Sequence, residues 1–186
     1  MSGDGLHAHS ANKAGAWHPL SEHLESVGRL SLAFAGPAPW SGEAALAGRL
    51  HDLGKYGERF QRRLLGQESG LDHWSSGAWL ALTKYRAIAA ALAIQGHHIG
   101  LQRGDNGSLA GLDPGKLVNH HPLGLRLSTA DLERTLELAC HDGLIFSSPS
   151  TRAISSWDKP TAAMLDVRLL FSCVVDADFL DTEAHY

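Results

Sequence analysis

Apolar residues recur every three or four positions along most of this chain, while the strict alternation of apolar and polar residues that is typical of strands is scarce. The first stripe follows Pro19, a residue suited to a first helical turn. Its members are Leu20, Leu24, Val27, Leu30 and Phe34. This spacing predicts a helix over 19–34, and the glycine- and proline-containing breaker 36–39 separates it from a second predicted helix over 42–51.

Four more segments carry a helical pattern, so the predicted fold class is all-α. We expect these helices over 56–65, 76–95, 128–140 and 161–180. The alanine-rich helix over 76–95 is expected to stop at Gly96, and Ser128-Thr129-Ala130-Asp131 resembles a capping box for the helix that follows it. The segments 100–127 and 147–160 contain glycine, serine and proline with little periodicity, and we expect irregular loops there.

The composition is that of an ordinary folded domain. The chain has 186 residues, of which 44% are apolar, so we expect one core and a single domain over 1–186. A net charge of −4 gives no general basic field, which leaves only local contacts to nucleic acid. Cys140 and Cys173 lack metal-binding spacing and are expected to be free thiols in a reducing compartment. The sequence has neither a signal-peptide pattern nor a membrane-spanning apolar run, so we expect a cytoplasmic protein without membrane contact.

Histidine is the unusual feature of this composition, with 12 copies. The most informative position is the pair His51-Asp52, because adjacent imidazole and carboxylate side chains let one helical turn hold or bridge divalent metal ions. An isolated His-Asp pair often arises by chance. This pair is accompanied by five more potential ligands at the ends or on the inner faces of predicted helices, namely His23, His73, His97, His98 and Asp178.

A helical bundle can bring these side chains to one interior point, where Asp52 is the natural bridge between two ions. One ion would take His23, His51, Asp52 and Asp178, and a second would take Asp52, His73, His97 and His98. Such an imidazole-rich set favours Mn, Fe, Co, Ni or Zn over Mg, which prefers oxygen ligands and retained water. The alternative is a bundle whose buried histidines are satisfied by hydrogen bonds alone, a costly arrangement for so many converging imidazoles.

Six motifs follow one another along the chain. They are Ala8-His9-Ser10, Leu20-Ser21-Glu22-His23-Leu24, Leu50-His51-Asp52-Leu53-Gly54-Lys55-Tyr56, Asp72-His73 with Gly77-Ala78, Gly96-His97-His98-Ile99-Gly100-Leu101, and the segment 170–183 with its Asp176-Ala177-Asp178 core. Together they resemble the HD nuclease domain of the CRISPR-associated type I helicase-nuclease, and the resemblance covers nearly the whole chain. The His-Asp pair alone would indicate only the HD phosphohydrolase superfamily, whereas the paired histidines and the Asp-Ala-Asp ending are more specific.

The resemblance implies an HD-domain helical bundle with a metal site between the helices. It further implies a nuclease that uses one or two divalent transition-metal ions to cleave single-stranded DNA in type I CRISPR interference, by attack of metal-activated water. The implied partners are single-stranded DNA, a CRISPR helicase domain or subunit, and the CRISPR RNA-guided surveillance complex. No phosphate-cradling GxxxxGK[ST] loop occurs, so the chain has no helicase domain and is either a standalone subunit or a domain excised from a longer polypeptide.

Residue roles follow from the same resemblance. The metal ligands would be His23, His51, Asp52, His73, His97, His98 and Asp178, with Asp176 as the alternative to Asp178. The expected catalytic residues are His51, Asp52 and Lys55, and Lys55 would face the phosphate.

A short basic stretch after the metal motif provides the predicted DNA contacts, which are Lys55, Arg59, Arg62 and Arg63. Three nearby aromatic residues, Tyr56, Phe60 and Trp74, would offer faces on which unpaired bases stack. A solvated helix face with core aromatics explains the same residues equally well.

The sequence gives less reason to expect a functional role for the other histidines. We expect the loop pair His120-His121 to be exposed to solvent. His9 would orient a ligand, contact substrate or make a local hydrogen bond. We assign no function to His7, His18, His141 and His185.

Two other functions use the same ligand set. A phosphohydrolase of the HD superfamily that acts on nucleotides or cyclic nucleotides would need a closed base pocket instead of an open channel for a strand. A non-catalytic metal-binding module would dock a helicase or a surveillance complex without cleaving DNA.

Overall fold

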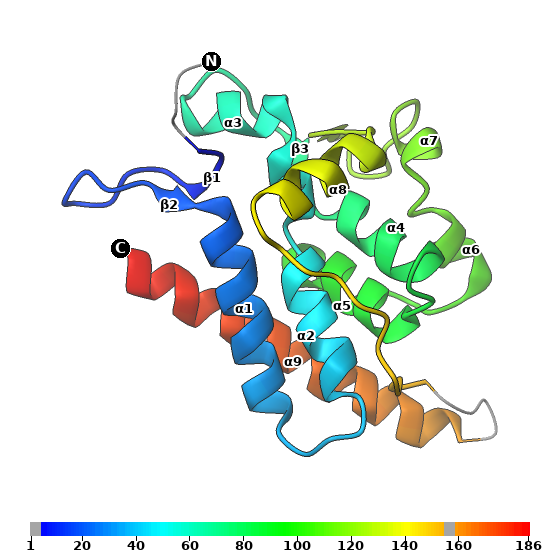
Figure 1. The fold of residues 1–186 in the computed structure, drawn as a ribbon. Coiled ribbons are helices and arrows are strands. Elements are labelled where there is room, and N and C mark those ends of the chain that lie inside the picture. Colours follow the sequence, from blue (N-terminus) through cyan, green and yellow to red (C-terminus); the bar gives the residue numbers. More distant parts are fainter. Residues whose placement is uncertain (1–4, 155–158) are drawn as a thin grey trace.

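The protein is described from a computed structural model that covers residues 5–154 and 159–186. It is mostly helical, which confirms the predicted class at this level (Figure 1). The helices are α1 (Leu20–Ala35), α2 (Ser41–Leu50), the 3-10 helix η1 (Leu53–Tyr56), α3 (Glu58–Leu64), α4 (Ser75–Thr83), α5 (Ile88–Ile99), α6 (Asn106–Ala110), α7 (Pro114–Leu117), α8 (Leu132–His141) and α9 (Pro160–His185). The strands are short: β1 (His7–His9) pairs antiparallel with β2 (His18–Pro19), and β3 (Leu71–Asp72) pairs parallel with β4 (Arg126–Leu127).

Helix α2 lies at the centre of the bundle, where it contacts α1, α4, α5 and α9 (Figure 1). Leu24, Leu50 and Leu170 are fully buried among these helices. Gly77 on α4 permits a close approach to the end of α2, because a Cβ there would overlap the carbonyl oxygen of Leu50. The chain that follows Leu50 therefore stays inside the core, where His51 and Asp52 are buried.

The single helix predicted over 76–95 is wrong, because the chain breaks it into α4 and α5. Arg86 adopts a left-handed φ of 54°, and the N–H groups of Tyr85 and Ala87 bond back to carbonyls in the last turns of α4. The break buries both Tyr85 and Ala87 in the core. Neither glycine nor proline occurs at the break between α4 and α5, so this alanine-rich sequence gives no local signal that the helix is interrupted.

The predicted stop at Gly96 is also wrong. Helix α5 continues to Ile99, and Gly100, with a φ of 79°, ends it instead. Gly96 lies inside the helix. The position suits glycine because a side chain there would press on Phe171 of α9 and on the backbone of Leu101. His97 and His98 consequently project from the last turn of a regular helix.

Two other helix ends differ from the prediction. Helix α8 begins at Leu132, and the side chain of Asp131 caps it by accepting a hydrogen bond from the N–H of Arg134. Ser128 is not the cap, since its hydroxyl donates to the carbonyl oxygen of Gly54. Helix α9 extends beyond the predicted end at residue 180 and reaches His185.

The two predicted loops are largely irregular. Residues 100–127 carry only the short helices α6 and α7 and the strand β4. In the other loop, residues 155–158 lie outside the described part of the chain. Its described beginning is fixed by Glu43 of α2, whose buried carboxylate accepts hydrogen bonds from the N–H groups of Ala90 and Ala153.

Within the described residues, no helix is both long enough and apolar enough to cross a membrane. Cys140, which is exposed, and Cys173, which is buried, are both free thiols, as predicted.

Candidate metal centre

The carboxylate of Asp52 lies between two groups of histidines, one at each oxygen. The group at Oδ2, which we call the closed side, contains His23 from α1, His51 from the end of α2 and Asp178 from α9. The ring Nε2 atoms of His23 and His51 lie 3.5 and 3.3 Å from Asp52 Oδ2. The same two atoms lie 3.6 and 3.5 Å from Asp178 Oδ1. Four potential ligand atoms from three helices therefore surround one point.

The group at Oδ1, which we call the open side, contains His73, His97 and His98. Their Nε2 atoms lie 3.3, 3.5 and 3.9 Å from Asp52 Oδ1. His73 follows β3, whereas the other two come from the last turn of α5. The side chain of His98 is 38% exposed, while those of His73 and His97 are buried.

Hydrogen bonds to the rear nitrogens orient three of the imidazoles. The Nδ1 atoms of His51 and His97 lie 2.7 and 2.6 Å from the carbonyl oxygens of Gly48 and Ile94. The Nδ1 atom of His23 lies 2.7 Å from Oδ2 of Asp181. An acceptor at Nδ1 requires a proton there, so the Nε2 atom of each ring, which faces the Asp52 carboxylate, is the one that would bind a metal ion. Metal-binding histidines are typically oriented in this way.

Several buried atoms of the cluster lack a hydrogen-bond partner among the described residues. They are Nε2 of His23, His51 and His97 and Oδ1 of Asp52. Burial of a polar atom without a partner is costly, and native proteins rarely tolerate several such atoms at one point. Each of these atoms is a good ligand for a divalent transition metal. The orphaned atoms and their shared focus thus fit metal binding better than a purely hydrogen-bonded core.

The spacing of the closed side agrees with that interpretation. Two ligands that are each about 2.0–2.1 Å from one tetrahedral ion are about 3.3 Å apart. The four N···O separations on the closed side range from 3.3 to 3.6 Å. The cluster can therefore hold a divalent metal ion with little rearrangement of its ligands.

The charges of the cluster are strongly coupled. Burial would lower the pKa of His51, but the carboxylates of Asp52 and Asp178 outweigh this effect and raise the pKa to about 10. Burial would likewise raise the pKa of Asp52, but Lys55 and the imidazoles of His51 and His73 hold it well below its usual range. Burial would also raise the pKa of Asp178, but the neighbouring His51 lowers it. The carboxyl groups of Asp52 and Asp178 are therefore ionised at neutral pH and supply the negative charge that a cation needs.

On the open side, the pKa values of two imidazoles are lowered instead of raised. Burial and the neighbouring His97 lower the pKa of His98 to about 3, and burial also lowers the pKa of His73. The Nε2 atoms of His73 and His98 lie only 2.8 Å apart. Both imidazoles are neutral at pH 7, which is the form that binds metal ions.

Lys55 lies beside the closed side at the end of η1. Its ammonium is 2.6 Å from Asp52 Oδ2 and donates to the carbonyl oxygen of Ala8 at 3.1 Å. The residue is 5% exposed, and it also borders the cleft described below. A cation bound at Oδ2 would repel this ammonium, so Lys55 is placed to turn toward an anion in the cleft.

An open cleft of about 360 Å³ leads to the open side. It is lined by residues that include Lys55, Phe60, Arg63, His73, His98 and Tyr186. A larger hollow of about 560 Å³ lies between α1 and residues 142–145 and contains none of the candidate ligands. Of these two hollows, the smaller cleft is the one that borders candidate ligands, namely His73 and His98.

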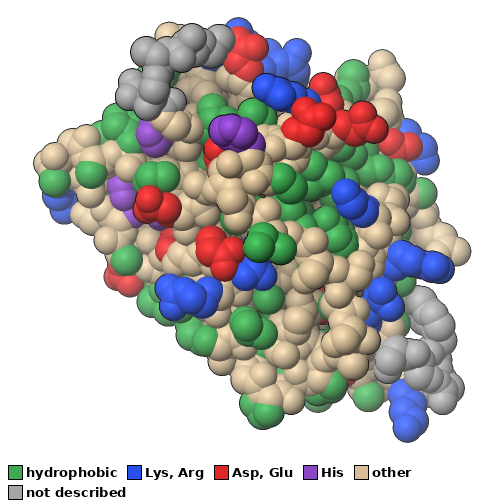
Figure 2. All heavy atoms as spheres, in the orientation of Figure 1, with side chains coloured by type: hydrophobic (Ala, Val, Ile, Leu, Met, Phe, Trp, Pro, Cys, Tyr) green, Lys and Arg blue, Asp and Glu red, His purple; other side chains and the backbone are tan. Residues whose placement is uncertain are grey.

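The predicted DNA contacts are dispersed. Arg63 borders the cleft and covers the ring of Phe60, with its guanidinium carbon 5.6 Å from the ring centre. Arg62 is instead paired with Glu58 and Glu68, and Arg59 donates to the carbonyl oxygen of Leu127. On the face seen in Figure 2, basic side chains are scattered among acidic and apolar ones without a continuous basic tract.

The stacking role suggested for three aromatic residues does not fit their positions. Tyr56, Phe60 and Trp74 are all buried. The Tyr56 hydroxyl donates to Asp142, and Phe60 and Trp74 pack against the ring of His73. The rings of Phe60 and Trp74 flank the candidate ligand His73, and all three aromatic residues belong to the buried core.

The two aspartates proposed as alternatives on α9 lie in different surroundings. Asp178 is placed within the closed side, at the distances given above. Asp176 is exposed and borders a hollow with Phe34, Phe179 and Leu180. This placement favours Asp178 as the ligand.

Sequence reasoning missed several residues that support the ligands. Asp181, one helical turn after Asp178, accepts the bond from His23, and its i+3 spacing was a usable signal. His121 was expected to be exposed, which is wrong: its side chain is 5% exposed, and its Nε2 lies 2.9 Å from Asp72 Oδ2. The other oxygen of Asp72 accepts the N–H groups of Trp74 and Ser75, which fixes the backbone around His73. No local pattern links His121 to a strand so distant in sequence.

No protein-family model matches this chain, and no curated protein sequence matches it at a significant level. The metal-binding interpretation therefore depends on the geometry of the site and on the motifs in the sequence.

Proposed function

We propose that this chain is a metal-dependent nuclease that cleaves single-stranded DNA, as the HD nuclease component of a type I CRISPR system. The observation that carries the proposal is the position of Asp52, which presents one carboxylate oxygen to each of two imidazole groups. A shared carboxylate between two ions about 3.5–4 Å apart is typical of hydrolases that act on phosphate esters. The ordered motifs described above then favour the HD nuclease class over other hydrolases with two metal ions.

The ligand set also supports a choice of metal. Of the seven candidate ligands, five are imidazoles and two are carboxylates. This composition suits Mn, Fe, Co, Ni or Zn, whereas Mg prefers oxygen ligands. A bound ion would supply hydroxide near neutral pH and offset charge on the phosphate oxygens.

The residues of the chain would position the substrate around this centre. His98, the most exposed ligand, and Lys55 both line the cleft, so a phosphate that enters it meets one imidazole group and one ammonium. Lys55 already makes hydrogen bonds to oxygen acceptors and would transfer one of them to a non-bridging phosphate oxygen. Arg63, which also lines the cleft, would contact a neighbouring phosphate of the same DNA strand.

The shape of the cleft favours a DNA strand over a free nucleotide as the substrate. A phosphohydrolase specific for nucleotides needs a closed pocket that holds the base. The cleft beside His98 is open, and the ring of Phe60, one of its lining residues, is covered by Lys55 and Arg63. We therefore favour a polymeric substrate that lies across the surface.

The test uses circular single-stranded DNA and protein stripped of metal, with Mn, Co, Ni and Mg restored one at a time. We expect cleavage with the transition metals, and its loss in Asp52→Ala and Asp178→Ala. Asp176→Ala is the matched control, because this exposed aspartate lies on the same helix and should leave cleavage unchanged.

Three other results would contradict the proposal. Turnover of nucleotides without cleavage of DNA would indicate the phosphohydrolase. Metal binding without either activity, even when a type I surveillance complex and helicase are added, would indicate a docking module. Cleavage that survives Asp52→Ala would indicate a contaminating nuclease.

A further inference from the structure

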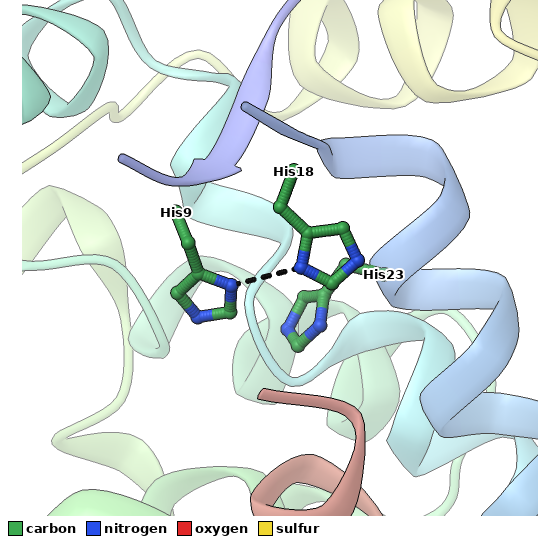
Figure 3. A group of neighbouring side chains, drawn as sticks. All are labelled: His9, His18 and His23. Carbon is green, nitrogen blue, oxygen red and sulfur yellow. Dashed lines mark hydrogen bonds between the residues drawn. The ribbon is translucent and has the colours of Figure 1, made fainter. Parts of the chain in front are cut away.

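A third group of histidines lies outside the central cluster, where β1 and β2 meet the start of α1. His9 and His18 face each other across the two antiparallel strands, and His23 follows one turn into the helix (Figure 3). Each of the three rings offers a nitrogen within 4.8 Å of the other two. His9 and His18 are partly buried, whereas His23 is fully buried and also belongs to the closed side.

The separation of the two outer rings matches that of two ligands on one ion. The Nδ1 atoms of His9 and His18 are 3.1 Å apart (Figure 3). Nitrogen ligands of one tetrahedral transition-metal ion are about 3.3 Å apart, as on the closed side. The ring centre of His23 lies 4.8 Å from that of His9 and 5.2 Å from that of His18, so the third imidazole is close to the same point.

Each rear nitrogen has an oxygen neighbour to which it could donate, which would leave both Nδ1 atoms free for a cation. Nε2 of His18 lies 3.5 Å from the carboxylate of Asp181, and Nε2 of His9 lies 3.5 Å from the hydroxyl of Thr182. When both Nε2 atoms carry the proton and donate to these oxygens, two Nδ1 lone pairs face each other at 3.1 Å. That arrangement is repulsive unless a cation lies between them, and oxygen partners behind the ring are typical of metal-binding histidines.

We propose that the Nδ1 atoms of His9 and His18 form an outer binding site for a further divalent transition-metal ion. His23 borders this site without binding the ion, because its Nδ1 is bonded to Asp181 and its Nε2 faces the closed side. With two exclusive neutral ligands that are partly exposed, the outer ion is bound more weakly than the central ones. The nearby carboxylate of Asp181 offsets part of its charge. This inference concerns metal binding and holds whether or not the chain cleaves DNA.

The test counts bound ions directly. Metal-stripped protein is dialysed against excess Co²⁺, and the cobalt per chain is measured by elemental analysis. We expect the double variant His9→Gln/His18→Gln to bind one Co²⁺ fewer than the wild type. His141→Gln is the matched control, because the side chain of His141 is 89% exposed and belongs to neither group. An unchanged count in the double variant would overturn the proposal.

Two further measurements keep the result clear. The Asp52→Ala variant should lose central ions but retain the outer one, and loss of every ion in Asp52→Ala would overturn the proposal. In protein labelled with ¹⁵N-histidine, Zn²⁺ should shift two Nδ1 resonances that are absent from the double variant. If these Nδ1 resonances do not respond to Zn²⁺, the proposal is overturned. This measurement on the wild type does not require the variant to fold. If the outer ion is found but DNA is not cleaved, only the proposed function fails.

Discussion

The two sides of Asp52 use similar ligands in different surroundings. On the closed side, His23, His51 and Asp178 come from three packed helices, and both imidazoles are completely buried. On the open side, His98 is 38% exposed at the edge of a cleft. A rigid, enclosed set of ligands favours permanent retention of an ion, whereas a partly exposed set leaves room for substrate. Under the proposed function, this difference predicts that the closed side retains its ion more tightly and that the substrate approaches from the open side.

Substitution of one ligand on each side gives the largest expected contrast. His51→Gln should reduce metal affinity on the closed side by at least about 100-fold, since loss of a mere supporting partner already costs about 10–100-fold. His98→Gln should leave the closed-side ion in place and weaken only the open side. Calorimetric titration with Mn²⁺ would resolve the two effects. Equal loss on both sides in His98→Gln would contradict the division.

The two sides should also make the metal-free protein respond to pH in opposite ways. The pKa of His98 falls from 6.5 to about 3 on folding, so the unfolded chain binds more protons in that range and stability rises with pH there. The pKa of His51 rises from 6.5 to about 10, so its contribution is complete below pH 6.5 and is lost as the pH approaches 10. Thermal unfolding in EDTA should therefore show maximum stability near pH 6.5.

A single substitution can test that assignment. His51→Gln should remove the decline above pH 6.5 while the decline at low pH remains. A wild-type profile that rises steadily from pH 6.5 to 10 would mean that His51 is not held in its charged form by Asp52 and Asp178.

A smaller effect should follow from the support behind the open side. His121→Ala removes the partner of Asp72 and should loosen the backbone around His73. We expect roughly a 10-fold loss of open-side metal affinity, the lower end of the range for such partners. His120→Ala is the matched control, because this neighbour is exposed. The same Mn²⁺ titration measures both, and equal affinities would show that His121 is dispensable.

The smallest expected effect concerns the part of the bound DNA strand that lies beyond the metal centre. Arg63→Ala should weaken binding of single-stranded DNA and reduce the slope of log affinity against log salt by about 0.7, the value for one phosphate contact. Arg62→Ala should change the slope little, since Arg62 is already paired with Glu58 and Glu68. Fluorescence anisotropy over a range of salt concentrations distinguishes them. Equal slopes for the two variants would remove Arg63 from the binding surface.

The sequence predicted those parts of the molecule that depend on local patterns. Periodicity located most helices, and the motifs His51-Asp52 and His97-His98 supplied imidazoles that the fold does bring to the carboxylate of Asp52. The break at Arg86 was missed because it depends on the burial of Tyr85. The neighbouring residues give no sequence signal for that burial.

Long-range contacts explain the other errors. His18 approaches His9 through strand pairing, and His121 reaches Asp72 from a loop 49 residues away. Neither contact follows from a helical period or a turn signal. Residues that support or extend a site in this way are therefore visible only once the tertiary structure is known.

The central claim is that Asp52 joins two metal ions, and electron paramagnetic resonance of the Mn²⁺-loaded protein tests it most directly. Two Mn²⁺ ions that share one carboxylate are magnetically coupled, so we predict a coupled spectrum that disappears in Asp52→Ala. A spectrum of isolated Mn²⁺ alone in the fully loaded wild type would contradict the claim.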